Sequence, residues 1–198
     1  KSRGNVISPD TLIEKYGSDA FRLYLMFGFS YVEGGPWNDK GLESIQRFMD
    51  RVERLVGHSR TFSYNNNPLT AAEKNIEYVR NNTIKCVTAD TENFAFNTAI
   101  ARIMEFTNAL TDYENKVSDK NAVFKECVED LVKVLAPFAP HFTEELWEIL
   151  GNKTTIFNTE FPKVNEKALI KDELELAVQI NSRVKAKIVV PSGADKDE

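Results

Sequence analysis

The spacing of apolar side chains constrains the fold of this chain more than any other feature of its sequence. In successive segments between residues 39 and 151, apolar residues recur every three or four positions, the period of an amphipathic α-helix. The longest stripe consists of Ile45, Phe48, Met49, Val52, Leu55 and Val56. An amphipathic helix buries one face only, so several such helices must pack together. The pattern therefore predicts an antiparallel bundle of four or five helices.

Capping residues predict where individual helices begin and end. Ser8 before Pro9 is typical of a helix start, and Gly17 is typical of a helix end. The next segment, residues 18–27, is apolar on nearly all sides, so we expect it to be buried. Thr70-Ala71-Ala72-Glu73 has the capping-box pattern that starts a helix. Further helices are expected to begin at Asn38 or Asp39, near Asn93, near Asp119 and at Pro140.

The period of the apolar residues changes near the end of the chain. Alternate residues are apolar from Leu174 to Ile180 and again from Val184 to Val190, which is strand periodicity. Asn181-Ser182 separates the two runs, so the sequence predicts a β-hairpin. The expected class is mainly α, with a small and incomplete β element at the C-terminal end. The second run also alternates its apolar residues with three cations, Arg183, Lys185 and Lys187.

Composition excludes several kinds of protein. The net charge is −5 and the pI is about 5.3, which argues against a bulk electrostatic nucleic-acid binder but leaves a local basic face possible. Two cysteines and two histidines are too few for a disulfide scaffold or for a cysteine- or histidine-rich metal site. No apolar run approaches the roughly 20 residues of a membrane-spanning helix. These features suit a cytoplasmic protein, and the polar first residues suggest a piece of something longer.

The sequence contains no self-contained catalytic set. It has no glycine-rich phosphate loop and no nucleophile elbow. His141 follows Pro140 at a helix start, and we expect a structural role for it. Trp37 and Trp147 border amphipathic helices and are expected to anchor the core rather than stack on bases. The first five residues, Lys-Ser-Arg-Gly-Asn, have the chemistry to surround a polyphosphate, and the alternative is an ordinary solvated loop.

Three arginines form a candidate nucleic-acid-binding ladder. Arg47, Arg51 and Arg54 are spaced i, i+4 and i+7, so they share one face of the long helix and can follow the phosphates of a stem. The alternative is an ordinary solvated face, because acids are interspersed and Glu43 to Arg47 is a normal helix pair. Arg22 either lies near a bound stem or pairs within the fold.

Several blocks resemble class I aminoacyl-tRNA synthetases. Lys1 and Ser2 resemble the last two residues of that family's Lys-Met-Ser-Lys-Ser loop, and the segment from Tyr16 to Arg22 resembles the stem-contact helices that follow it. More specific blocks are similar to the leucyl-tRNA synthetases of bacteria, at residues 37–52, 96–105, 135–147 and 178–188. The resemblance covers essentially the whole chain.

The resemblance implies a fragment of an enzyme that uses ATP with magnesium to activate leucine and then transfers leucine to tRNA(Leu). Lys1 and Ser2 would contact ATP. The residues that would contact tRNA are Arg22, Arg47, Arg51, Arg54, Arg183, Lys185 and Lys187. The catalytic parts of such an enzyme would lie upstream, so the fragment alone is not expected to catalyse or to hold a metal or cofactor. It is expected to be a monomer that does not associate with membranes.

The resemblance also implies four parts of the chain. These are a loop end with stem-contact helices (1–38), an anticodon-binding bundle (39–151), a linker (152–173) and the start of a C-terminal β domain (174–198). Two alternatives remain open. One is the same domain of a valyl, isoleucyl or methionyl enzyme. The other is a helical protein-interaction module with no nucleic-acid role, which the acidic pI favours slightly.

Overall fold

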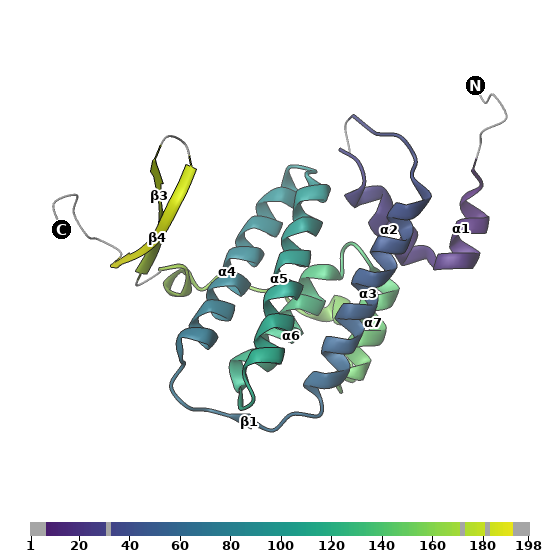
Figure 1. Ribbon diagram of the computed structural model, residues 1–198. Helices are drawn as coiled ribbons and strands as arrows, with labels where there is room; N and C mark the ends of the chain where they lie inside the picture. Colours follow the sequence, from purple (N-terminus) through teal and green to yellow (C-terminus); the bar gives the residue numbers. More distant parts are fainter. Residues whose placement is uncertain (1–6, 31–32, 171–172, 181–182, 192–198) are drawn as a thin grey trace.

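The computed structural model describes residues 7–30, 33–170, 173–180 and 183–191, and it describes the last two ranges as backbone only. Seven α-helices dominate this part of the chain (Figure 1), so the expected mainly α class is confirmed. The helices are α1 (Pro9–Tyr16), α2 (Ser18–Phe27), α3 (Asp39–Ser59), α4 (Ala71–Glu92), α5 (Phe96–Lys116), α6 (Ala122–Leu135) and α7 (Pro140–Ile149). None of them is both long and apolar enough to cross a membrane.

The helices enclose one apolar core. Helix α4 packs against α5 and α6, while α3 packs against α5, α6 and α7 (Figure 1). The core includes the fully buried rings of Phe48, Phe106, Phe124 and Phe138. The predicted stripe on α3 is confirmed, since its members are buried except for the half-buried Met49. Burial of apolar area on this scale is the main force that holds such a bundle together.

Helix α2 is less buried than its composition indicated. Ala20, Leu23 and Tyr24 are buried, but the Leu25 side chain is 44% exposed. The expectation that this helix is buried therefore holds for one face only, because α1, α3, α5 and α7 leave part of its circumference uncovered.

Most predicted helix ends are confirmed. Ser8 precedes α1, and Gly17 follows it with φ +83°, a conformation that glycine adopts at little cost. The Asn38 side chain accepts a hydrogen bond from the Lys40 N–H and caps α3. Helices α5 and α6 begin a few residues later than expected. Phe94, with φ +56°, interrupts the helix before α5, and Asn121 caps α6 by accepting from Val123.

A carboxylate on α2 caps α7. Asp19 is buried, and its Oδ2 accepts a hydrogen bond from the Phe142 N–H at 2.6 Å. Its Oδ1 lies 3.1 Å from Nδ1 of His141. A negative charge at a helix N-terminus satisfies a free amide and complements the helix dipole. His141 thus has the structural environment that the sequence indicated.

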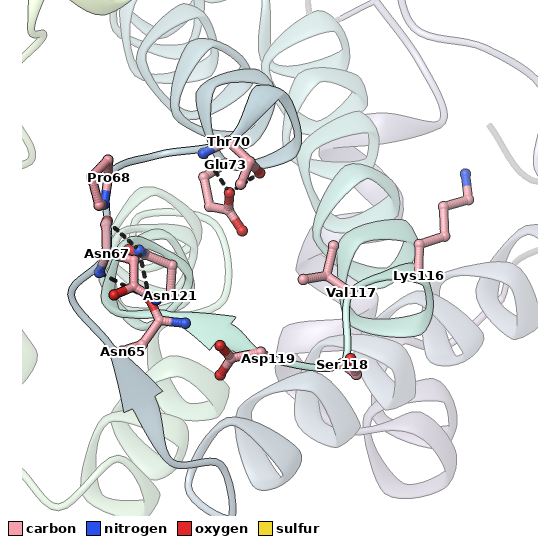
Figure 2. Close-up of a pocket in the computed structure, with 10 residues that line it drawn as sticks. All are labelled: Asn65, Asn67, Pro68, Thr70, Glu73, Lys116, Val117, Ser118, Asp119 and Asn121. Atoms are coloured by element: carbon pink, nitrogen blue, oxygen red, sulfur yellow. Dashed lines mark hydrogen bonds between the residues drawn. The ribbon is translucent and has the colours of Figure 1, made fainter.

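The end of the bundle where α4 and α6 begin contains a short parallel strand pair that the sequence did not indicate. Strand β1 (Tyr64–Asn65), before α4, pairs with β2 (Lys120–Asn121), before α6. The Asn121 amide donates to Asn65 Oδ1 at 3.1 Å and to the Asn67 carbonyl at 3.0 Å (Figure 2). A shallow hollow of about 370 Å³ opens beside these residues. The pairing ties the α3–α4 loop to the α5–α6 loop.

The predicted capping box continues into this polar cluster. Glu73 accepts from the Thr70 N–H at 2.8 Å and from the Tyr113 hydroxyl at 2.6 Å. Burial raises the pKa of the Glu73 carboxyl, but these hydrogen bonds outweigh burial and hold the pKa below its ordinary value. The ionised carboxylate therefore joins α4 to α5 at this end of the bundle.

The chain after α7 crosses the bundle and leads to the hairpin. It contains two 3-10 turns, η1 (Ile156–Asn158) and η2 (Glu166–Leu169). Strands β3 (Glu173–Ile180) and β4 (Arg183–Pro191) then pair antiparallel, which confirms the predicted hairpin. The expected turn residues Asn181 and Ser182 lie outside the described residues. Val178 pairs with Ala186 and Gln179 with Val184, so the pairing skips Lys185 in a bulge.

Candidate nucleic-acid interface

The arginine face of α3, formed by Arg47, Arg51 and Arg54, is accessible at both of its ends. Arg47 and Arg54 are exposed. The Arg47 guanidinium donates to the Ser44 hydroxyl at 2.8 Å. Within the described ranges, no carboxylate makes an ion pair with any of the three arginines. No described acid therefore holds any of these guanidinium groups in an ion pair.

Arg51, the central member of the arginine face, lies partly within the bundle. The residue is half-buried, and its Nε lies below the surface without a hydrogen-bond partner among the described residues. Arginine commonly covers apolar surface with its stem while its guanidinium remains available at the tip. A buried donor without a partner costs stability, so an acceptor that reached it would be favourable.

Acidic residues occupy the flanks of the same helix. Glu43, Asp50 and Glu53 are all exposed. They lower the positive potential near the arginines and explain why the helix does not stand out as basic in composition. The interface that α3 offers is consequently a narrow cationic ladder rather than a broad basic patch.

The other candidate residues are distributed elsewhere. The Arg22 guanidinium donates to the Pro137 carbonyl at 3.3 Å, so it pairs within the fold while remaining exposed. Lys1 and Ser2 lie outside the described residues. Arg183, Lys185 and Lys187 belong to β4, of which the structure describes the backbone alone. Among the candidates whose side chains the structure describes, it brings together the three arginines of α3 and no others.

Both tryptophans pack inward. Trp147 is only 6% exposed, with the Lys133 ammonium 5.5 Å from its ring centre. Trp37 is half-buried and meets Tyr24 edge-on at 4.8 Å. The expectation that these rings anchor the core is confirmed for Trp147, and Trp37 packs against the same core.

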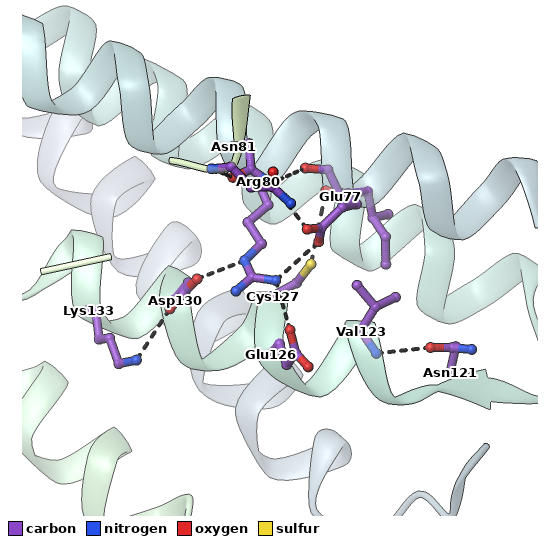
Figure 3. Close-up of polar contacts among 11 residues, drawn as sticks. Glu77, Arg80, Asn81, Asn121, Val123, Glu126, Cys127, Asp130 and Lys133 are labelled. Carbon is purple, nitrogen blue, oxygen red and sulfur yellow. Dashed lines mark hydrogen bonds and ion pairs between the residues drawn. The ribbon is translucent and has the colours of Figure 1, made fainter. Parts of the chain in front are cut away.

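A fourth arginine, absent from the sequence-based candidates, lies at the centre of an ionic cluster. Arg80 Nε donates to Asp130 at 2.7 Å, and Nη1 donates to Glu77 at 3.1 Å and to Glu126 at 3.0 Å (Figure 3). Burial alone would lower the pKa of the guanidinium, but Asp130 and Glu77 raise it above its ordinary value. The Glu77 to Arg80 spacing is visible in the sequence, whereas Asp130 is far away along the chain.

Lys120 is a buried cation with a structural partner set. Its Nζ donates to the carbonyls of Glu114, at 2.8 Å, and Val117, and it lies 5.0 Å from the Phe62 ring centre. The ammonium therefore satisfies carbonyls at the C-terminal end of α5. No group of three or more potential metal ligands occurs among the residues that the structure places.

Comparison with known families places these observations in context. The family model described as the anticodon-binding domain of tRNA ligase matches residues 73–198. Over the whole chain, the sequence is 55% identical to a leucine–tRNA ligase of Caldanaerobacter subterraneus and 50% identical to one of Clostridium kluyveri. In both cases the chain spans about 25% of the relative's length.

Solved structures show the same fold. A leucyl-tRNA synthetase of Agrobacterium radiobacter, in a ternary complex with tRNA and LeuAMS, superposes with a TM-score of 0.83 at 32% identity. The match covers all of this chain and 26% of that one. The free methionyl-tRNA synthetase of Mycobacterium tuberculosis matches with a TM-score of 0.63 and 15% identity over 75% of this chain and 35% of that chain, which shows the fold alone.

The leucyl relatives support the main interpretation over the valyl, isoleucyl and methionyl alternatives and over a protein-interaction module. The chain belongs to the anticodon-binding domain family of tRNA ligases, within the leucyl-tRNA synthetases.

Proposed function

We propose that this chain docks tRNA(Leu) through the arginine face of α3, as part of a cytoplasmic, monomeric enzyme that joins leucine to that tRNA. The observation that carries the proposal is the state of Arg47 and Arg54, which are exposed and make no ion pair with a described carboxylate. A relative with the same fold was solved with tRNA bound. Unpaired arginines on a rigid helix are suited to phosphate oxygens, which accept two parallel hydrogen bonds from one guanidinium.

The geometry of the arginine face fits contacts to a backbone rather than to bases. From Arg47 to Arg54 the helix advances roughly 10 Å, or two turns, so the guanidinium groups can reach successive phosphates. Phosphate contacts fix the position of a nucleic acid without reading its sequence. The choice of tRNA(Leu) would therefore depend on shape and on other parts of the enzyme.

The remaining sequence-based assignments extend this proposal. Lys1 and Ser2 would contact ATP, and the cations of β4, Arg183, Lys185 and Lys187, would add a second tRNA contact beyond the bundle. Arg22 would contribute at the stem end through the guanidinium donors that its bond to the Pro137 carbonyl leaves free. ATP with magnesium, leucine and the chemical steps would belong to other parts of the parent enzyme, so this chain alone should give no leucine-dependent ATP–pyrophosphate exchange.

The test is a titration of tRNA(Leu) against the chain at several salt concentrations. Charge reversal of Arg47→Glu together with Arg51→Glu should weaken binding by about tenfold per arginine at low salt and should flatten the salt dependence. Arg102→Glu is the matched control, because Arg102 is an exposed arginine on α5 that already pairs with Glu105 at 3.1 Å. Unchanged binding by the double variant would show that tRNA uses another face.

A further inference from the structure

The segment between α7 and the hairpin is fastened to the bundle at two points. At the first, Glu144 on α7 accepts from the Ile156 N–H at 3.1 Å and from the Thr155 hydroxyl at 2.9 Å. At the second, Asn81 on α4 accepts from the Asn165 N–H at 2.7 Å. Both anchors hold backbone amides, so they define the path of the segment itself.

The orientation of the Asn81 amide follows from its neighbours. The residue is only 2% exposed. Its Nδ2 donates to the Glu77 carbonyl at 2.9 Å and to Glu77 Oε1 at 3.2 Å. Since both of these atoms only accept, the amide nitrogen must face them, and the amide oxygen must face the Asn165 N–H. The second anchor therefore has one orientation that satisfies every bond.

The Arg80 cluster holds Glu77 in place. Arg80 donates to Glu77 Oε2 while it is itself fixed by Asp130 and Glu126 on α6 (Figure 3). Lys133 also contacts Asp130, at 3.3 Å. Apart from the exposed Glu126, the members of this network are largely buried, and such a network is rigid because loosening one bond leaves another group unsatisfied. The cluster thus extends from α6 through Arg80 and Glu77 to Asn81.

The other contact in this region is weaker. Lys85 lies 3.4 Å from Glu166, and both side chains are more than half exposed, so the pair contributes little. Val164 packs against the core and η2 lies against α4, but neither adds a hydrogen bond from the backbone of the segment to the helix. Asn81 is consequently the residue that specifies where the segment lies shortly before β3 begins at Glu173.

We propose that Asn81 is a positioning residue: it fastens the segment around Asn165 to α4 and so keeps the β3–β4 hairpin within reach of bound tRNA. The proposal rests on the proposed tRNA-docking function. Without this anchor, only the Lys85–Glu166 pair and the packing of Val164 and η2 hold the segment to the bundle after Ile156. Whenever these weaker contacts open, the free tether before β3 begins after Ile156 instead of after Asn165 and roughly doubles in length. Doubling a flexible tether lowers the effective concentration of its end by about threefold, so tRNA affinity should fall by a similar factor.

The first measurement is local and needs no tRNA. Trypsin cleaves after lysine, and Lys163 and Lys167 are exposed on either side of Asn165. Asn81→Ala should accelerate cleavage at these two sites about tenfold, because a buried hydrogen bond is lost. Asn93→Ala is the matched control: Asn93 donates to the carbonyl four residues before it, as Asn81 does, but belongs to the exposed end of α4.

A rescue experiment separates positioning from general stability. Asn81→Asp keeps the acceptor for Asn165 but puts a carboxylate against Glu77, so cleavage should again accelerate. Adding Glu77→Gln supplies an amide donor to the new carboxylate, and cleavage should return toward the wild-type rate.

If Asn81→Ala does not fold, Asn165→Pro removes the same N–H from the segment, with Asn165→Ala as its control. Equal cleavage rates in wild type and Asn165→Pro would contradict the claim that the Asn165 N–H fastens the segment to Asn81.

The second measurement is tRNA affinity in the same variants. A loss of about threefold in Asn81→Ala, reversed in the rescued double variant, supports the proposal. Unchanged affinity in Asn81→Ala, while Arg47→Glu with Arg51→Glu still weakens binding, overturns positioning and leaves the proposed function standing. If wild type does not bind tRNA, the proposed function and the positioning role both fall, whereas the trypsin result still decides whether Asn81 fastens the segment.

Discussion

Arginines on α3 and α4 show how the same side chain serves two purposes in one bundle. Arg47 and Arg54 on α3 are exposed and make no ion pair with a described acid. The Arg80 side chain on α4 is 17% exposed and bonds to three carboxylates. The first arrangement leaves charge available to a ligand, and the second uses charge to join α4 to α6. Residue type therefore does not identify a ligand-binding arginine; burial and the number of acid partners do.

The largest expected effect tests the buried side of this contrast. Asp130 is 8% exposed and bonds to Arg80 Nε. Asp130→Ala leaves the guanidinium half-enclosed without its best partner and should cost about 3 kcal/mol of unfolding free energy in urea. Glu126→Ala removes the most exposed partner of Arg80 and should cost less than about 1 kcal/mol. Similar losses in both variants would show that burial does not set the strength of these pairs.

A second prediction extends the contrast to a buried acid that has hydrogen-bond donors rather than a cation. Glu73→Gln should lower stability at pH 7 by about 1.5 kcal/mol, since hydrogen bonds to a charged group are replaced by neutral ones. The pKa of folded Glu73 lies below its ordinary value near 4.5, so this contribution is present above that pH and is lost as the pH falls through the folded pKa. Urea unfolding of both proteins from pH 7 to pH 3 measures it. A difference that grows at low pH would contradict the account.

The third prediction concerns the exposed side. Arg54→Ala should change the unfolding free energy by less than about 0.5 kcal/mol, because the side chain is exposed and unpaired in the described fold. The same variant should reduce the slope of log affinity for tRNA(Leu) against log salt by about one. A slope of log affinity against log salt equal to that of the wild type would mean that Arg54 contacts no phosphate. Arg102→Ala provides the reference for an exposed arginine elsewhere.

The smallest expected effect tests whether an ion pair between two exposed side chains contributes little to stability. Lys116 lies 3.1 Å from Asp112, one turn earlier on α5, and both side chains are about 70% exposed. Lys116→Ala should cost no more than about 0.3 kcal/mol in thermal or urea unfolding. A loss comparable to that of Asp130→Ala would remove the distinction between the two kinds of pair.

Local chemistry made much of the fold predictable from sequence. The α3 stripe, the Thr70–Glu73 capping box and the terminal hairpin depend on neighbours in the chain, and each appears in the structure. The parallel pairing of Asn65 with Asn121 was not predictable, because it joins two loops that are distant in sequence. The same reason hid the Asn81–Asn165 bond and the Arg80–Asp130 pair.

The candidate site was predictable in outline only. The spacing of Arg47, Arg51 and Arg54 places them on one helix face, but their burial depends on what packs beside α3. From the sequence, the three arginines are therefore equivalent. In the structure, Arg51 is half-buried, and its Nε has no partner among the described residues. Acid partners decide which arginines remain available, and these come from elsewhere in the fold.

The Asp19 carboxylate has a consequence for exchanging this bundle between relatives. It lies on α2 but completes the first turn of α7, which is distant in the chain. A chimera whose donor portion started at α3 would take α2 from the host, so the amide of α7 would keep its acceptor only where the host helix carried a carboxylate at the position of Asp19. A transplant that included α2 of this chain would keep Asp19 together with the α7 amide that it caps. Helix α2 and the bundle should therefore be exchanged together.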